Sequence, residues 1–572
     1  MKKGKKVFTA VSTAVLSGLT GFVFGFGVCW WTIPVPSEKT DVRQALMIMG
    51  PDTGGYGAYL AGFLASQNQD YDRAAAYWTT AMKQAPDVPK IKIPVYLMRL
   101  VRGDVAGALP LARDLQTLKQ PELLADEVLI ADALRRADYD TAARLLKDKP
   151  AYGVDNLFKP AIGAWIEVGR KNKKAALKAL APLNKEKTRA FYEYYTALVS
   201  LAFSDTKAAQ KAFTRMDKQA QAGYPSLTAL VFMRDFLTTQ KAWKAGRAEY
   251  DHAERVLAKM PAVRETINTL HAPTVITPAI GAAVVYYDTS VALAPLKVQE
   301  TSLVLNALAM YLDPDAMTPR IWAAELLEGI KNYRAANEIY DGMKNKTDLV
   351  SLKQAMNMIA DENYTSALPA VEALIQRAGN DGFLLSLAAE AAYRAEDYER
   401  AVRYYRQSAD ALLQAGQADT AAEALLMLAH TYETADQPDQ VEPTLQEAMR
   451  ANPNNALVLN YLGYVWLDAR KNINEAFDLV ARAYAMAPND PNIMDSMALG
   501  YYVKQDYVQA LPLAERATDE LPFSSVAYAH LGDIYAALGR NREARYQYRK
   551  ALDLAADITP ALRRELESKL KK

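Results

Sequence analysis

Small residues recur along the chain at a constant spacing of 34 residues. Steps of this length relate Ala74, Ala108, Ala142 and Ala176 near one end, and Ala510 with Ala544, Ala517 with Ala551 and Pro488 with Pro522 near the other. The first three alanines each close a short segment that begins with Asp, a residue that favours turns and helix starts. A fixed period of this length predicts stacked pairs of helices, in which the small residue allows the second helix to approach the first closely.

The first helix of each expected pair places a small residue three positions before an aromatic one, so that both lie on one helical face. Examples are Gly463 with Trp466, Ala498 with Tyr501 and Gly532 with Tyr535, while the first clear unit carries Gly62, Ala74, Trp78, Ala81 and Pro86. These residue types and spacings resemble the tetratricopeptide repeat (TPR). The resemblance implies an all-α fold, a right-handed superhelical solenoid of roughly eleven or twelve helix pairs between residues 55 and 558.

The period is lost between about residues 222 and 300, where Pro261, Pro273 and Pro278 interrupt the helical pattern. The sequence therefore predicts two repeat arms. The expected bounds are 55–222 for an N-terminal TPR arm, 223–300 for an irregular helical junction, 301–558 for a C-terminal TPR arm and 559–572 for a capping helix. The alternating charges of that last helix suit an exposed end of a solenoid.

A long uncharged segment, Val7–Ile33, follows the basic stretch 2–6. At about 1.5 Å per residue, a helix of this length exceeds the roughly 30 Å of a bilayer core. The basic flank predicts that residues 1–33 form a cytoplasmic tip and a single-pass anchor in the bacterial inner membrane, with 34–54 as a linker and the repeats in the periplasm. Two alternatives stay open: a cleaved signal that releases the chain into the periplasm, and an outer-membrane lipoprotein attached through Cys29.

Composition and charge exclude several classes of function. Lys and Arg together number 67 against 66 Asp and Glu, so no net field favours nucleic acid. The single cysteine and the four separated histidines provide no spacing for a metal site, and no phosphate-binding loop or nucleophile motif is present. We therefore expect a non-enzyme without a cofactor or metal. An enzyme with a cryptic site is the less favoured alternative.

Polar and aromatic residues on the expected first helices are candidates for a protein-binding groove. They are Asn460, Tyr464, Asp495, Tyr502 and Asp533. First helices line the concave side of such a solenoid, and that side takes an extended peptide or a partner helix. Tyrosine suits the role because it combines a flat apolar ring with a hydroxyl group. Ordinary packing between repeats is the competing interpretation for the tyrosines.

A separate cluster of positive charge comprises Arg170, Lys171, Lys173, Lys174 and Lys178. Such a cluster is a candidate contact for an anionic surface, such as membrane headgroups or a cell-wall polymer. The competing interpretation is an ordinary solvated face of a second helix.

The C-terminal block contains Asn460-Tyr-Leu-Gly-Tyr464, Asp495-Ser496 and His530-Leu-Gly-Asp533. This series resembles a proteobacterial family of envelope TPR proteins, one of which is an outer-membrane lipoprotein adaptor of a carboxyl-terminal processing protease. The resemblance implies a scaffold that binds partner proteins and recruits a protease or cell-wall enzyme. The chain departs from that relative at the anchor, because Val28 stands where a lipobox needs a small residue. A structural assembly factor for outer-membrane or secretion machinery is the alternative, and homodimer formation stays open.

Overall fold

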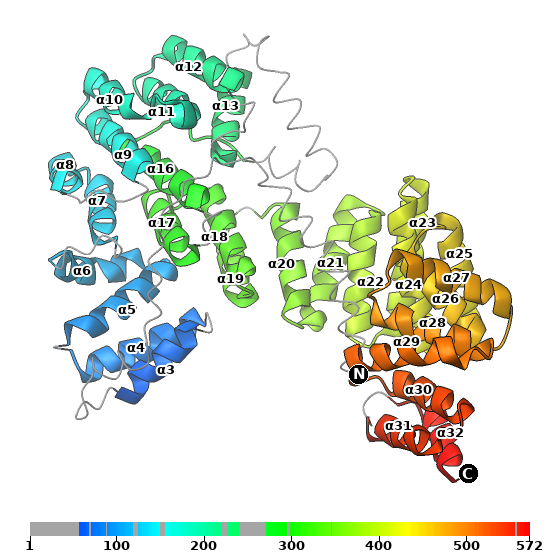
Figure 1. Ribbon diagram of the computed structural model, residues 1–572. Helices are drawn as coiled ribbons and strands as arrows, with labels where there is room; N and C mark the ends of the chain where they lie inside the picture. Colours follow the sequence, from blue (N-terminus) through cyan, green and yellow to red (C-terminus); the bar gives the residue numbers. More distant parts are fainter. Residues whose placement is uncertain are drawn as a thin grey trace. The chain divides into compact units, whose positions relative to one another are not determined.

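Every element in the described part of the chain is helical, as Figure 1 shows. The computed structural model describes residues 56–67, 70–86, 88–117, 124–148, 155–219, 226–239, 270–293, 298–344, 346–554 and 558–571. The prediction of an all-α fold built from helix pairs is therefore confirmed. The predicted anchor and linker, residues 1–54, lie outside the described residues.

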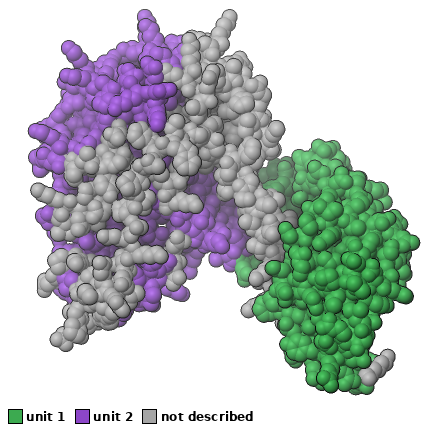
Figure 2. Space-filling model, in the orientation of Figure 1, with its two compact units in different colours: residues 1–24, 362–572 green, residues 25–361 purple. Residues whose placement is uncertain are grey.

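The described helices fall into two compact units, which Figure 2 draws in different colours. In the N-terminal unit, Gly25–Asp361, the helices are α3 (Tyr56–Gln67), α4 (Tyr71–Gln84), α5 (Pro89–Val101), α6 (Val105–Gln116), α7 (Ala125–Arg135), α8 (Tyr139–Asp148), α9 (Asp155–Gly169), α10 (Lys173–Ala179), η2 (Ala181–Leu183), η3 (Glu186–Thr188), α11 (Arg189–Ala202), α12 (Thr206–Gln219), α13 (Leu227–Thr239), α16 (Pro278–Leu293), α17 (Gln299–Leu312), α18 (Met317–Gly329), α19 (Tyr333–Asp341) and α20 (Asp348–Ala360).

In the C-terminal unit, Glu362–Lys572, the helices are α21 (Tyr364–Ala378), α22 (Gly382–Arg394), α23 (Tyr398–Gln414), α24 (Ala418–Thr434), η6 (Pro438–Gln440), α25 (Val441–Ala451), α26 (Ala456–Asp468), α27 (Ile473–Met486), α28 (Pro491–Val503), α29 (Tyr507–Glu520), α30 (Ser525–Ala537), α31 (Asn541–Asp553) and α32 (Pro560–Lys571). From α22 onward, even-numbered helices up to α30 are the first helices of their pairs and odd-numbered ones the second.

Several helix pairs share one turn geometry. A residue with left-handed φ ends the first helix, and the next residue caps the second helix with its side chain. Gln505 has φ 65°, and Asp506 Oδ1 accepts a hydrogen bond from a backbone N–H at 3.2 Å. Ala137, with φ 56°, and Asp138 repeat the arrangement. The left-handed residue redirects the chain, and the cap satisfies an N–H that a helix start leaves free. The predicted role of Asp in opening these turns is confirmed.

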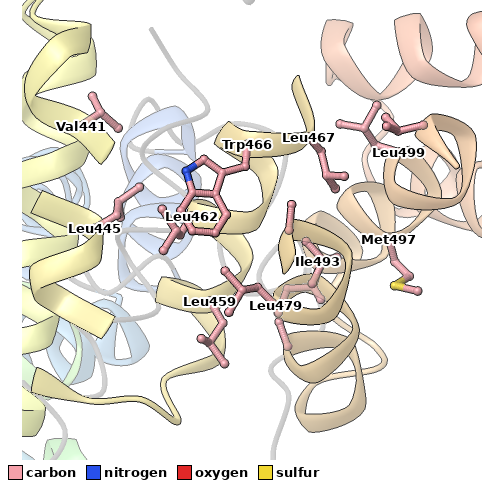
Figure 3. Close-up of a cluster of buried hydrophobic side chains, with 14 of the residues drawn as sticks. Val441, Leu445, Leu459, Leu462, Trp466, Leu467, Leu479, Ile493, Met497 and Leu499 are labelled. Atoms are coloured by element: carbon pink, nitrogen blue, oxygen red, sulfur yellow. The ribbon is translucent and has the colours of Figure 1, made fainter. Parts of the chain in front are cut away.

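Apolar residues of both helices in a pair, and of the next first helix, form the core of the C-terminal unit. Figure 3 shows Leu459, Leu462 and Trp466 of α26 packed with Leu479 of α27 and Ile493 of α28. The three residues of α26 recur at intervals of three and four, so they lie on one side of the helix. Each helix pair therefore completes its core only when the next pair stacks on it.

Glycine at the small position of a first helix allows an aromatic residue of the second helix to approach. A Cβ atom built at Gly532 would lie 2.4 Å from Tyr548 Cε1, and one at Gly62 would lie 2.6 Å from Trp78 Cδ1. Both distances are too short for any side chain at either glycine unless the ring moves. The close approach expected from the sequence is thus found at both ends of the chain.

Two helices of the N-terminal unit pack back against much earlier ones. α16 contacts α7 and α9, and α17 contacts α5, α6 and α7, as Figure 1 shows. The residues from Gly281 to Ser290 are buried all around α16. Tyr286 Oη donates to the carbonyl oxygen of Glu127 at 2.8 Å. In the pairs α5–α6, α7–α8 and α9–α10, the first helices α5, α7 and α9 are therefore covered by helices of the same chain.

This packing decides where the described chain divides into compact units. The boundary between the compact units lies after Asp361, because α16 and α17 tie the residues that follow them to the N-terminal helices. Within the junction predicted at 223–300, α16 is a regular helix that begins at Pro278, a position where proline is tolerated. Residues 240–269 of that junction lie outside the described part.

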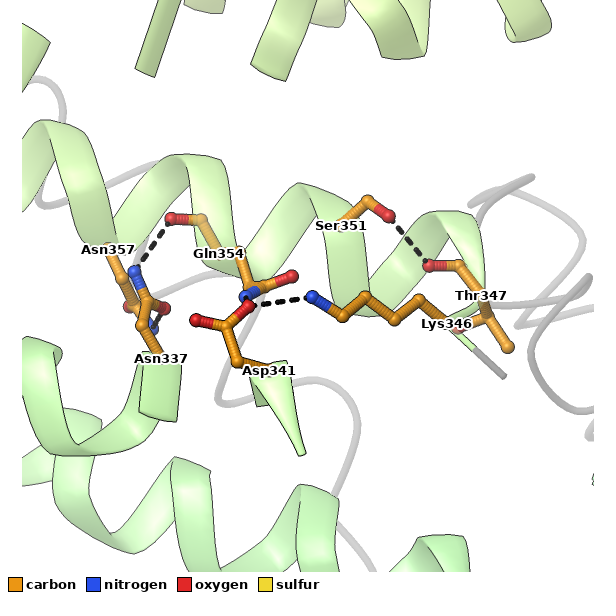
Figure 4. Close-up of polar contacts among 7 residues, drawn as sticks. All are labelled: Asn337, Asp341, Lys346, Thr347, Ser351, Gln354 and Asn357. Carbon is orange, nitrogen blue, oxygen red and sulfur yellow. Dashed lines mark hydrogen bonds and ion pairs between the residues drawn. The ribbon is translucent and has the colours of Figure 1, made fainter. Parts of the chain in front are cut away.

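Polar contacts join α19 to α20, as Figure 4 shows. Asp341 Oδ1 accepts from Gln354 Nε2 at 2.9 Å and forms an ion pair with Lys346 Nζ at 2.7 Å. Asn357 Nδ2 donates to Asn337 Oδ1 at 3.0 Å. Because each group shown has a partner, this interface is held by directional hydrogen bonds as well as by packing.

Candidate functional site

Direct contacts between successive first helices define an inner face on the C-terminal unit. α24 contacts α26, α26 contacts α28, and α28 contacts α30. Among these fully described helices, the second helices α25, α27, α29 and α31 make no contacts of comparable extent with one another. A stack whose first helices lie closer together curves toward them, so the first helices line its concave side. We call the surface on α24, α26, α28 and α30 the inner face.

All five candidate groove residues belong to helices of the inner face. Asn460 and Tyr464 are on α26, Asp495 and Tyr502 are on α28, and Asp533 is on α30. The helical pattern alone was sufficient to locate them on first helices. Their contacts, however, differ. Some of these side chains form ion pairs or hydrogen bonds with other residues of the chain, and some have an oxygen atom without a donor.

Asp495 is paired with His530 across the gap between α28 and α30. His530 Nδ1 lies 2.9 Å from Asp495 Oδ2, and the two side chains are 11% and 10% exposed. Burial alone lowers the pKa of His530, but nearby carboxylates, chiefly that of Asp495, raise it above its usual value. Asp533 and Asp468 act in the same direction. The Tyr464 ring lies 6.3 Å from the His530 ring, so Tyr464 takes part in packing between repeats.

Asp533 is engaged by the C-terminal helix of the same chain. Lys569 Nζ, on α32, lies 2.6 Å from Asp533 Oδ1 and 2.8 Å from Oδ2. Tyr548 Oη donates to the same Oδ1 at 2.7 Å. Lys569, which also pairs with Glu565 at 2.6 Å, therefore offsets part of the charge of Asp533 before any partner arrives. The predicted capping helix thus supplies a cation to the inner face in addition to covering the end of the stack.

Two candidate residues keep unused acceptors. Asn460 Oδ1 and Asp495 Oδ1 are buried, and neither has a hydrogen-bond donor among the described residues. Tyr502 is half-buried, with the Arg470 guanidinium 5.4 Å from its ring centre and the Tyr507 ring 5.8 Å away. These two acceptors therefore lie beneath the inner face, and Tyr502 contributes a partly exposed ring to it.

Asp468 is an inner-face carboxylate that the sequence reasoning missed. It follows Asn460 and Tyr464 at successive steps of four residues on α26, so the three share one side of the helix. Asp468 is exposed, and no ion pair or hydrogen bond holds it within the described residues. Extending the same periodicity by one turn would have found it. Glu433 of α24, bonded to the Tyr461 hydroxyl, is a second missed carboxylate.

The basic cluster is partly neutralised. Arg170 pairs with Asp140 at 2.6 Å and with Glu167 at 2.9 Å, and Lys173 pairs with Asp205 at 2.6 Å. Lys171, Lys174 and Lys178 remain exposed, around the short helix α10. Because Asp140 and Asp205 come from other parts of the sequence, the local run of Lys and Arg overstated the positive field of this surface.

A nearly buried lysine in the N-terminal unit lies between two carboxylates. Lys353 Nζ lies 3.0 Å from Glu325 and 3.2 Å from Glu328, and all three side chains are at most 13% exposed. Burial disfavours the charged lysine, but the two glutamates outweigh burial and raise the pKa of Lys353. Such a lysine stays protonated and paired, which suits a structural role better than proton transfer.

Neither a metal centre nor a membrane span emerges from the described ranges. No group of three His, Cys, Asp or Glu residues there is arranged to hold a metal ion. Among those helices, none combines the length and the hydropathy needed to cross a bilayer. The segment 7–33, which the sequence predicts as a span, lies outside these ranges.

Comparisons with known proteins point to one kind of repeat. A family model of the tetratricopeptide repeat matches residues 525–558, which contain α30 and α31. A TPR repeat-containing protein of Pseudomonas aeruginosa is 35% identical over 94 residues, or 16% of each chain. The anaphase-promoting complex subunit CDC16 of Saccharomyces cerevisiae is 29% identical over 139 residues, which cover 23% of this chain and 16% of that protein. The matched stretch is therefore less than one fifth of either relative's length.

Among solved structures, the APC/C hetero-tetramer Cut9–Hcn1 is similar over 93% of this chain and 98% of that one, at 12% identity and a TM-score of 0.35. The repeat match coincides with one observed helix pair, and further pairs with the same turn geometry and the same small-to-aromatic contact precede it. The chain therefore contains tetratricopeptide repeats, of which the family model identifies the one at residues 525–558.

Proposed function

We propose that the chain is a non-catalytic scaffold of the bacterial cell envelope that binds other proteins through the inner face of its C-terminal unit. One observation carries the proposal. The inner face keeps buried acceptors without donors, at Asn460 and Asp495, whereas the first helices α5, α7 and α9 of the other unit are covered by α16 and α17. Stacked helical repeats use such concave surfaces to receive an extended peptide or a partner helix.

The envelope location rests on the sequence. The uncharged segment Val7–Ile33, with its basic flank, supports a single-pass anchor that leaves the repeats in the periplasm. The mass of the mature N-terminus tests this: retention of Lys2 is expected. A diacylated Cys29 would instead indicate a lipid attachment. Loss of residues 1–33 would instead indicate a cleaved signal.

The partner class rests on the resemblance of the block 460–533 to envelope TPR adaptors. We propose a protease or cell-wall enzyme as the recruited partner. Affinity capture from solubilised membranes should recover such an enzyme in stoichiometric amount. Recovery of general chaperones alone would rule out the recruiting role, and sedimentation with a large membrane complex in place of an enzyme would favour an assembly factor.

A matched pair of substitutions tests whether the inner face is the binding surface. Tyr502→Ala removes a half-buried ring from the inner face, and Tyr546→Ala removes a ring that is 63% exposed on the second helix α31. Truncating a tyrosine at an interaction hot spot should reduce partner recovery about tenfold or more. We expect this loss only for Tyr502→Ala. Equal recovery with both variants would contradict the assignment of the inner face.

A further inference from the structure

We infer that the outer side of the last repeat docks on an anionic lipid surface. Four side chains of the second helix α31 form the contact, and we call them the outer patch: Arg542, Arg545, Tyr546 and Arg549. The inference goes beyond protein binding by the inner face, and it does not depend on the anchor proposed at residues 7–33.

The outer patch is a single stripe along one helix. Its later three members follow the first by three, four and seven residues, so helical periodicity places all four on one side of α31. All four are exposed, whereas Ala544, Tyr548 and Ala551 are buried on the side that packs against α30. At about 1.5 Å per residue, the stripe extends roughly 10 Å along the helix axis. The geometry of one helix therefore brings the four side chains together.

The chain does not balance the positive charge of the outer patch. None of its three guanidinium groups forms an ion pair or a hydrogen bond within the described residues. By contrast, Arg540, just before the helix, pairs with Glu543 at 3.0 Å. Asp553, one turn beyond the patch, is the acid of α31 on the same side. Three cations and one acid leave an excess of positive charge, so an anionic partner is complementary to this surface.

This stripe of cations is confined to the last repeat. Residues 34 positions earlier, on α29, and 34 positions earlier again, on α27, include no lysine or arginine. These equivalent residues are Val508, Leu511, Pro512 and Glu515 on α29, and Asn474, Phe477, Asp478 and Ala481 on α27. Glu515 accepts a hydrogen bond from the Tyr535 hydroxyl at 2.6 Å. The outer patch is therefore not a general property of second helices in this chain.

Exposed apolar groups accompany the arginines. The Tyr546 ring is 63% exposed, and Val508, which precedes Arg542 by one repeat, is 74% exposed. Pro512, also exposed, precedes Tyr546 by the same step. Equivalent residues of successive second helices lie on the same side of a helical stack. The outer side of the last two pairs therefore presents apolar groups together with cations.

A lipid surface fits both kinds of group. Arginine binds phosphate oxygens through paired hydrogen bonds, and tyrosine is enriched where headgroups meet the apolar layer. Anionic headgroups attract basic residues, while apolar side chains beside those residues enter the boundary of the acyl layer. An acidic protein segment would match the arginines alone. The exposed apolar neighbours therefore favour lipid over an acidic segment.

The test uses the full chain in zwitterionic nanodiscs, which accommodate an N-terminal anchor without supplying anionic lipid. Cys29→Ser removes the only cysteine, and Asn541→Cys, at an exposed position beside the outer patch, carries a polarity-sensitive fluorophore. Phosphatidylcholine vesicles with or without anionic phosphatidylglycerol are then titrated. We expect a blue shift of the emission only with the anionic vesicles. Raising the ionic strength should weaken this binding, because the Debye length shortens.

Neutral variants localise the contact. Arg542→Gln, Arg545→Gln and Arg549→Gln should each weaken binding of anionic vesicles about fivefold, the contribution of one basic residue near an anionic surface. The three substitutions together should weaken it about a hundredfold. Because the three side chains are exposed and unpaired within the described residues, the helical circular dichroism should be retained.

The matched control neutralises three exposed lysines of the basic cluster in the other unit: Lys171→Gln, Lys174→Gln and Lys178→Gln. It removes the same charge from the chain, so it should leave vesicle binding unchanged if the outer patch makes the contact. An equal loss of binding in this control would overturn the inference, because net charge would then explain the attraction.

Other results would also overturn the inference. They are an equal response to both kinds of vesicle, no response to anionic vesicles, and binding that survives the three arginine substitutions together. A blue shift caused by a polyglutamate peptide but not by anionic vesicles would assign the outer patch to an acidic protein segment. The inner-face test with Tyr502→Ala measures recovery of a protein partner, so the proposed protein-binding function is decided separately.

Discussion

His530 Nδ1 lies 2.9 Å from Asp495 Oδ2, and this contact joins the first helices of two successive repeats. Both side chains are almost fully removed from water. The pair therefore has a structural role in the stack and leaves the buried Asp495 Oδ1 without a hydrogen bond. It also makes the C-terminal unit sensitive to pH in a defined direction.

The first prediction concerns that pH dependence. The pKa of His530 is raised in the folded state. The charged pair therefore contributes its full stabilisation of the fold below the unfolded-state pKa of about 6.5, and this contribution is lost as the pH rises through the folded-state pKa. His530→Gln should lower the free energy of unfolding by about 1–2 kcal/mol at about pH 6 and by less at about pH 9. Urea denaturation at the two pH values measures this difference.

A histidine NMR titration provides the direct check. The chain has four histidines, so the signal lost in His530→Gln identifies His530. We expect it to titrate above the usual histidine range. A signal from His530 that titrates below about pH 6.5, the ordinary histidine value, would contradict the prediction.

The second prediction concerns the close packing of α16 on α9. A Cβ atom at Gly281 would lie 2.2 Å from the Trp165 ring, which is fully buried. Gly281→Ala should therefore destabilise the protein by about 1–3 kcal/mol, as overpacking does. At Gly163, on the same helix as Trp165, the nearest atom is 3.7 Å away, so Gly163→Ala should be neutral or stabilise by up to about 1 kcal/mol. Equal changes in urea denaturation would show that α16 does not pack on Trp165.

The third prediction concerns the left-handed turns. Gln505 and Gly539 are 34 residues apart and have φ of 65° and 74°. Gln505→Gly should stabilise by about 0.5–1 kcal/mol, because glycine adopts this conformation without strain, and Gly539→Ala should destabilise by about 1 kcal/mol. Thermal unfolding followed by circular dichroism measures both. Gln505→Ala keeps the strain, so its thermal stability should change little. A gain in stability equal to that of Gln505→Gly would refute the conformational explanation.

The fourth prediction concerns a buried carboxyl group on α16. Burial raises the pKa of Asp288 to about 7, although hydrogen bonds from Ser226 and Tyr195 partly oppose this. The folded state then keeps a proton that the unfolded state releases above about pH 4, so stability falls as the pH rises from about 4 to about 7. Asp288→Asn has no such proton, so its free energy of unfolding should rise by about 2–4 kcal/mol relative to that of the original chain across this interval.

Urea denaturation at about pH 4.5 and about pH 8 tests the fourth prediction, provided that both proteins are folded at both values. Asp148→Asn removes an exposed carboxyl from the same unit and should follow the original chain. Parallel pH dependence of Asp288→Asn and the original chain would show that Asp288 stays ionised in the folded state.

Local chemistry explains why much of the fold was predictable from the sequence. The Asp residues at 70, 104 and 138 cap second helices because their side chains bond to the backbone three residues ahead. Gly532 and Tyr548 meet because both belong to one helix pair. Such features depend on neighbours within a single repeat, so a period of 34 residues is sufficient to predict them.

Contacts between distant repeats were not predictable in the same way. Tyr286 bonds to Glu127 across 159 residues, and Lys569 reaches Asp533 from outside the last pair. Neither contact follows the period, and no local residue pattern specifies it. The helix pairs and the positions of the candidate residues on first helices were therefore predictable from the sequence. The tertiary structure alone decided which first helices the chain itself covers and which acceptors of the inner face stay available, because long-range packing determines both.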